Sequence, residues 1–109
     1  MDVLFVGDDL MARARVEDAA TRSGATVEVV SAEEIGRRVG DGGALVVVDL
    51  DRAGPDGLAR LGEVAGRARV IGYFSHVDEE LGRKARAEGV EALPRGRFWR
   101  ELPSILAGS

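Results

Sequence analysis

Apolar residues in this chain fall into short runs, separated by longer stretches in which apolar positions recur with a helical period. The runs are rich in Val, Leu and Ile and are apolar on both faces, as in strands buried inside a parallel sheet. They predict strands at residues 2–7, 26–30, 43–49, 69–74 and 90–93. The intervening stretches predict helices at residues 10–24, 31–39, 55–66, 78–89 and 98–107.

Polar residues and prolines near the predicted helix ends bear on these boundaries. Asp8 or Asp9 is expected to cap the first helix, and Ser31 with Glu34 forms a capping-box pattern at the second. Pro103 suits the last helix only within its first turn, because proline has no N–H to donate. That helix is therefore expected to begin late.

The alternation of strands and helices predicts a parallel sheet, because crossovers between parallel strands need helix-length connections. Residues 1–109 are expected to form one α/β domain, a flavodoxin-like, doubly wound five-stranded parallel sheet of order 2-1-3-4-5 with helices on both faces. Functional groups in such sheets gather at the carboxyl ends of the strands. Asp8 and Asp9 follow the first strand, and Asp49 and Asp51 follow the third. The fold therefore predicts that these acids come together.

Composition and charge exclude several classes of protein. With 19 acidic and 15 basic residues the net charge is −4, which argues against a general nucleic-acid binder. Cysteine is absent, which excludes disulfides and thiolate metal sites. His76 is the single histidine, so multi-histidine sites are excluded and no catalytic role is expected for it. No apolar run approaches the roughly 20 residues of a membrane span. We therefore expect a cytoplasmic protein whose partners are neither membranes nor nucleic acids.

Residues 46–58, VVVDLDRAGPDGL, carry a more specific pattern. They resemble the third strand and following loop of response-regulator receiver domains, an apolar run followed by Asp-Leu-x-x-x-Gly-x-Asp-Gly. The resemblance extends over nearly the whole chain and implies that Asp49 stands at the phosphoacceptor position. It also implies that Ser75 represents the Ser or Thr after the fourth strand, displaced by one residue. Arg95 stands where the family has a Lys, and the proline that follows that Lys in the family precedes it here, as Pro94.

Aspartyl phosphorylation needs a divalent cation, because Mg²⁺ neutralises the phosphoryl oxygens and takes oxygen ligands. The resemblance implies Mg²⁺ ligands from two acids after the first strand, from Asp49 and from the backbone carbonyl of Asp51. The alignment that keeps the apolar positions in place puts Gly7 and Asp8 at the paired-acid positions, and a shift of one residue puts Asp8 and Asp9 there. With Gly7 in the pair, Mg²⁺ binding is expected to be weak, with the Asp9 or Asp51 side chain as a compensating ligand.

Arginine is not equivalent to lysine at position 95, because its planar guanidinium holds carboxylates bidentately. We expect Arg95 to pair with Asp49 and to supply the positive charge that the metal would carry. The sequence thus predicts a degenerate receiver-like domain that acts through protein contacts without phosphorylation. It is not expected to be an enzyme, beyond self-phosphorylation and self-dephosphorylation at Asp49.

The expected partners are a sensor kinase or an output protein. The chain ends soon after its last predicted helix, so a stand-alone domain without a DNA-binding output domain is expected. Phe98 and Trp99 are expected to anchor that helix to the sheet. Their exposed remainder offers a homodimer face on the side formed by residues 69–74 and the last helix.

Two other functions stay open: a working Mg²⁺-dependent phosphoacceptor at Asp49, and a flavodoxin-like binder of a nucleotide or small ligand at the same loops. The residues also have simpler structural roles. Asp49 would end a strand, and Asp51 would form a turn. Ser75 would cap the following helix, and Arg95 would lie on a surface loop. Residues 40–43, GDGG, precede a strand and predict a turn, not a phosphate-binding loop.

Overall fold

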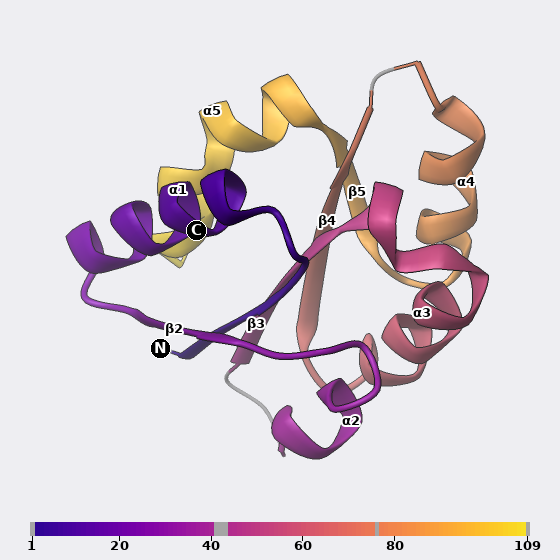
Figure 1. Ribbon diagram of the computed structural model, residues 1–109, viewed down its shortest axis with the longest axis horizontal. Coiled ribbons are helices and arrows are strands. Elements are labelled where there is room, and N and C mark those ends of the chain that lie inside the picture. The colour runs from indigo at the N-terminus through magenta and orange to yellow at the C-terminus, as the bar shows by residue number, and fades with distance from the viewer. Residues whose placement is uncertain (1, 41–43, 76, 109) are drawn as a thin grey trace.

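The computed structural model describes residues 2–40, 44–75 and 77–108. Within these ranges strands and helices alternate along the chain (Figure 1). The strands are β1 (Asp2–Val6), β2 (Thr26–Val29), β3 (Ala44–Asp49), β4 (Arg69–Phe74) and β5 (Glu91–Pro94). The helices are α1 (Leu10–Arg22), α2 (Ile35–Arg38), α3 (Leu50–Val64), α4 (Glu79–Ala87) and α5 (Arg95–Leu106).

The described strands form one parallel sheet of order β2-β1-β3-β4-β5, as the sequence predicts. Helices α1 and α5 lie on one side of this sheet, and α2, α3 and α4 lie on the other (Figure 1). The fold is therefore the expected doubly wound α/β sandwich. In the described part of the chain no helix is both long enough and apolar enough to cross a membrane.

The core is concentrated around β3, the central strand, in which every residue from 45 to 49 is buried. The layer beneath α1 and α5 holds the aromatic side chains of Phe5, Tyr73 and Phe98. The layer beneath α2, α3 and α4 is mostly aliphatic. Strand β2 lies at the sheet edge and is largely exposed, because the single turn of α2 covers little of it. The carboxyl end of β3 is thus held more firmly than that of β2.

Helix α3 begins at Leu50, earlier than the expected start at Pro55. Asp49 makes this possible because its backbone is extended and its carboxylate accepts a hydrogen bond from the Asp51 N–H, which caps a first turn. Gly54 then interrupts the helix with φ 70° and ψ 173°, a conformation that favours glycine. Pro55 starts the second segment, where its fixed φ suits the first helical position. The helix start predicted at Pro55 therefore matches the second segment of α3 and not the first turn.

Helix α5 begins at Arg95, directly after β5, so the expected late start was wrong. Pro103 consequently lies well inside the helix instead of in its first turn. A proline inside a helix costs about 3 kcal/mol. The helix buries Phe98, Leu102 and Ile105 against the sheet, and each such side chain contributes about 1.5–3 kcal/mol. Burial of the apolar face therefore outweighs the lost hydrogen bond.

The capping hydrogen bonds predicted for Asp9 and for the Ser31–Glu34 pair are present. Asp9 caps α1, its carboxylate accepting hydrogen bonds from the first turn of the helix. The Ser31 hydroxyl accepts from the Glu34 N–H at 3.2 Å, and the Glu34 carboxylate accepts from the Ser31 N–H at 3.1 Å. This box precedes α2, which is shorter than the predicted helix. The turn and strand start predicted at residues 41–43, and any role of His76, lie outside the described residues.

Candidate functional site

Three residues at the carboxyl ends of β1, β3 and β4 form a row across the sheet. Asp49 pairs in register with Tyr73, and paired residues of parallel strands project to the same face. Gly7 lies beside them, since a Cβ built on it would be 3.4 Å from the Asp49 Cβ. Tyr73 packs in the core beneath α1 and α5. The row therefore lies on that face of the sheet, where the fold predicts functional groups.

Asp49 is buried, with 2% of its surface exposed, and no other charged residue in the described part of the chain is buried to this degree. Its Oδ1 accepts a hydrogen bond from the Asp51 N–H at 3.1 Å and lies 3.6 Å from Arg95 Nη2. Burial raises the pKa of the Asp49 carboxyl; the Arg95 charge opposes this rise, and the Asp51 carboxylate adds to it. The charge of Asp49 thus depends on its neighbours.

Arg95 is brought to both carboxylates at the end of β3. Its Nη2 donates a hydrogen bond to Asp51 Oδ2 at 3.1 Å, shorter than its 3.6 Å contact with Asp49. The guanidinium also lies over the Tyr73 ring, 5.1 Å from its centre. Burial acts to lower the pKa of Arg95, but the hydrogen bond to Asp51 and the charge of Asp49 raise it overall. The expected contact with Asp49 is present, together with a closer one to Asp51.

Asp51 joins three loops of the carboxyl edge. Besides Arg95 at the start of α5, its carboxylate accepts hydrogen bonds from the Ser75 N–H, at 3.1 Å to one oxygen and 3.3 Å to the other. Ser75 does not cap α4; Asp78 does, by accepting from the Leu81 N–H. From the sequence, Asp51 was expected to form a turn or to bind a metal ion. Its hydrogen bonds to Ser75 and Arg95 were not predicted. Its partners come from loops whose relative positions only the folded sheet defines.

Tyr73 is a further member of the site that sequence reasoning missed. Its side chain is fully buried, and its hydroxyl has no hydrogen-bond partner among the described residues. Burial and the negative charge of Asp49 raise the pKa of the Tyr73 phenol, so it stays protonated. The available signal was its polar tip within the strand predicted to be buried at residues 69–74.

The acids after β1 do not join Asp49 and Asp51 in a metal site. Asp8 is largely exposed, with its carboxylate 3.7 Å from Arg52 Nη1, and Asp9 is engaged as the cap of α1. In the described ranges no three Asp, Glu or His side chains gather closely enough to hold a metal ion. Mg²⁺ prefers near-octahedral oxygen ligands that include carboxylates, and weak Mg²⁺ binding at this edge stays a prediction.

Gly7 shows why an acid is difficult to accommodate at its position. A Cβ there would lie 3.1 Å from two atoms of the Phe5 ring, closer than ordinary van der Waals contact. Phe5 is fully buried beneath α1, so its ring has little room to move. The packing of the core thus favours glycine at the position that one alignment gives to the first acid of the pair.

A hollow of about 460 Å³ lies beyond the carboxyl ends of β1, β2 and β3, at the switch point of the sheet. Its charged lining comprises three acidic residues, Asp8, Glu34 and Asp49, and one basic residue, Arg52. Acidic side chains outnumber the basic one, so the hollow disfavours the phosphates of a nucleotide. It lies where the small-ligand alternative expects a cavity, but its charge does not suit a nucleotide.

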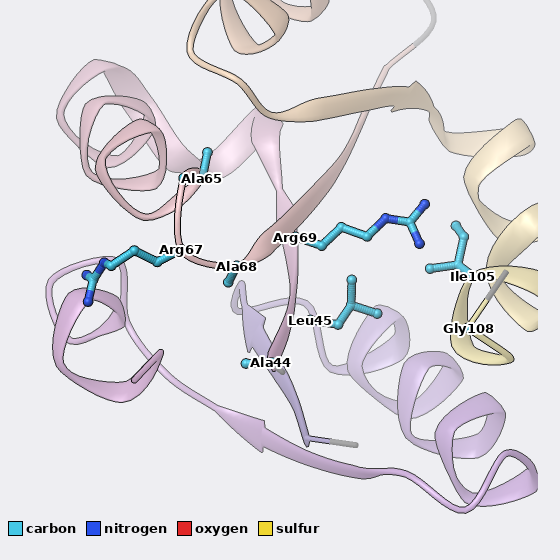
Figure 2. Close-up of a pocket in the computed structure, with 9 residues that line it drawn as sticks. Ala44, Leu45, Ala65, Arg67, Ala68, Arg69, Ile105 and Gly108 are labelled. Carbon is cyan, nitrogen blue, oxygen red and sulfur yellow. The ribbon is translucent and has the colours of Figure 1, made fainter. Parts of the chain in front are cut away.

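A second hollow of about 490 Å³ lies at the opposite end of the sheet, near the amino ends of β3 and β4 (Figure 2). Its lining is mostly Ala, Gly and other apolar residues. Arg67 turns away from it toward α2, where it donates to the Gly36 carbonyl (Figure 2). Arg69 forms an ion pair with Glu91. Distant from Asp49 and without acids in its lining, this hollow is not the candidate site.

The aromatic residues of α5 pack against Tyr73, a member of the site. Phe98 has no exposed surface and packs against Tyr73, with ring centres 5.0 Å apart. Trp99 is half-buried, and Arg15 lies over its ring at 4.2 Å. The expected anchoring role is confirmed. The expectation that Phe98 offers surface to a dimer was wrong, because its side chain points wholly into the core.

Comparisons with known proteins agree on the fold. No protein-family model and no curated protein matches the sequence. A solved structure from Burkholderia thailandensis, of a protein described as a CpaE pilus assembly protein, matches with a TM-score of 0.72 at 16% identity, covering 97% of this chain and 94% of that one. A second, of an atypical orphan response regulator, matches with a TM-score of 0.69 at 16% identity, covering 99% of this chain and 93% of that one.

Both of these structures have receiver-like folds. The present chain therefore has a receiver-like, flavodoxin-type α/β fold, as the resemblance in its sequence implies. The orphan response regulator is described as having a phosphorylation-independent regulatory mechanism. At 16% identity the likeness extends to the fold, and function has to be argued from the residues of this chain.

Proposed function

We propose that this protein is a receiver-like signalling domain that acts through contacts with a protein partner and does not use phosphorylation. The observation that supports this most directly is the position of Arg95, whose guanidinium contacts both Asp49 and Asp51. In this proposal the fixed positive charge of Arg95 substitutes for the charge that a bound metal ion would supply. The guanidinium compensates the buried carboxylate without any ligand.

The other side of the site supports the same proposal. Gly7 supplies no carboxylate, and Asp9 is engaged in capping α1. We therefore propose that function does not depend on Mg²⁺, that the domain is not an enzyme, and that it works in the cytoplasm with a sensor kinase or an output protein. A homodimer through the β4–α5 side stays a prediction, and of the two aromatic residues named for it only Trp99 retains exposed surface.

Nuclear magnetic resonance with a phosphoryl mimic tests this proposal. Mg²⁺ and beryllofluoride would be added at millimolar concentrations to the ¹⁵N-labelled protein, and the amide signals of Asp49, Asp51 and Ser75 followed. We expect these signals to stay unchanged. A saturable shift of all three, absent in Asp49→Asn, would overturn the proposal in favour of a working phosphoacceptor. The doubly substituted Gly7→Asp/Arg95→Lys protein is the matched comparison, because it brings both positions closer to the family pattern.

A further inference from the structure

A groove between α3 and α4 lies next to the site, and the argument for the proposed function does not use it. Its volume is about 510 Å³. The two helices lie side by side on the same face of the sheet, and the first turn of α3 is set apart from the rest of that helix (Figure 1). The groove opens at this interruption, since Gly54 and Pro55 both line it. The break in α3 therefore has a structural consequence on the surface.

The floor and walls of this groove are apolar. Leu58 on α3 and Leu81 on α4 line it from opposite sides, with Pro55, Ala59 and Ala87 more exposed toward its mouth. An apolar cleft of this size is in the range of ligand-binding cavities, and it is wide enough for large apolar side chains. Leu58 belongs to the buried core and Leu81 packs against that core, whereas Pro55, Ala59 and Ala87 are exposed.

The charged residues that line the groove are mainly acidic. Asp51, Asp78 and Glu88 line it together with Lys84, which forms an ion pair with Glu80 at 3.4 Å. Such a rim attracts cationic groups and repels nucleic acids and anionic lipid surfaces. Apolar walls with an acidic rim are complementary to a peptide segment that carries a bulky apolar residue beside Arg or Lys.

Asp51 connects the groove to the buried cluster. The residue lines the groove, and its carboxylate accepts hydrogen bonds from Arg95 and from the Ser75 N–H. A basic side chain bound in the groove would compete with Arg95 for this carboxylate. Binding in the groove would then change the surroundings of Asp49, the residue that Arg95 also contacts.

We propose that the α3–α4 groove binds a partner protein through a segment in which a bulky apolar side chain is flanked by arginine or lysine, and that Asp51 receives the basic group. This inference rests on the proposed function in one respect, because it assumes that the domain signals through contacts with a protein partner. It adds the surface and the chemistry of the partner. Loss of Arg95 as a competitor should strengthen binding, because Asp51 would then be free for the incoming cation.

A peptide library of about twelve residues displayed on phage provides the probe, selected against the whole protein. We expect enriched peptides to combine a bulky apolar residue with nearby Arg or Lys. Ala59→Arg, which fills the groove from an exposed helical position, should weaken the selected peptide about tenfold or more. Arg95→Gln should tighten it. Glu63→Arg is the matched control, because it lies on α3 outside the groove and changes the charge by more.

The outcomes separate the two proposals. No enrichment, enrichment of acidic peptides, or peptides that bind Ala59→Arg as well as the unchanged protein would overturn the groove as a docking site. A larger loss in Glu63→Arg than in Ala59→Arg would do the same, because it would show attraction by overall charge alone. Peptides bound elsewhere would leave signalling through protein contacts standing. A response to beryllofluoride would overturn the proposed function and leave the groove result unaffected.

Discussion

The two sides of the carboxyl edge of the sheet are built differently. On the β3–β5 side Asp49, Asp51, Ser75 and Arg95 are held together by hydrogen bonds and ion pairs. On the β1–β2 side Asp8 is exposed, Asp9 caps a helix, and the hollow beyond the strands is open. One side is closed by groups of the protein itself, and the other is accessible to solvent.

This difference shows that acids at one edge of a sheet can take different roles on its two sides. The buried carboxylate of Asp49 lies beside the guanidinium of Arg95. The acids after β1 contribute to capping and to an exposed ion pair instead. The following substitutions test this contrast, beginning with the largest expected effect.

Gly7→Asp tests the open side. Its new Cβ would lie 3.1 Å from the Phe5 ring and 3.4 Å from the Asp49 Cβ, and its charge would add to that of Asp49. Overpacking of a core costs about 1–3 kcal/mol, so urea unfolding at neutral pH should show a loss of this size. Gly66→Asp is the control, because a Cβ there meets nothing within 4 Å. Equal stability of Gly7→Asp and the unchanged protein would show that packing does not favour glycine here.

Arg95→Gln tests the closed side. It leaves the buried Asp49 and the neighbouring Asp51 without their shared cation, which should destabilise the fold by about 1 kcal/mol, since the guanidinium is partly screened by solvent. The Ser75 amide signal should also shift, because its acceptor loses an anchor. Arg97→Gln, which breaks an exposed ion pair with Glu101 on the same helix, should change stability much less. Equal effects in the two variants would contradict a special role for Arg95.

Asp49→Asn is expected to give the smallest effect, and the size of this effect depends on pH. Burial raises the pKa of Asp49 in the fold above its ordinary 3.8, so the folded state holds this proton more tightly than the unfolded chain. The resulting stabilisation is present at low pH and is lost as the pH rises through the raised pKa. The neutral amide should therefore be more stable than the ionised acid at pH 7, by up to about 1 kcal/mol.

The measurement for Asp49→Asn is the free energy of unfolding across the acid range, with Asp56→Asn on the exposed face of α3 as control. The advantage of asparagine should shrink below pH 3.8, where the acid is protonated in both states. A loss of stability at pH 7 would instead mean that the contact with Arg95 outweighs burial. The β3–β5 side would then be stabilised by a net favourable ion pair between Asp49 and Arg95.

The sequence predicted the sheet order because apolar runs, helix lengths and right-handed crossovers leave few arrangements. The resemblance to receiver domains, which places Arg95 at the position of a lysine, also implied that Arg95 approaches Asp49, and this contact is present. The closer contact with Asp51 and the bridge to Ser75 depend on loop conformations that no periodicity encodes. Tyr73 was missed because its register with Asp49 exists only once β3 and β4 pair.

Helix α3 marks another limit of sequence reasoning. Pro55 was correctly expected to begin a helical segment, but the turn before it depends on a capping interaction of Asp49 that competes with any other role of that carboxylate. The late start expected for α5 failed for a related reason. A single missing hydrogen bond at Pro103 was given more weight than the burial of the whole apolar face.

Pro94 is at once the last residue of β5 and the residue that precedes the first turn of α5. No loop residues separate β5 from α5. A displacement of Arg95 away from the sheet would therefore tilt α5. The same helix bears the sole tryptophan, Trp99, stacked under a guanidinium from α1. The intrinsic fluorescence of Trp99 should therefore report a displacement of α5 at Asp49 and Asp51, without an added label.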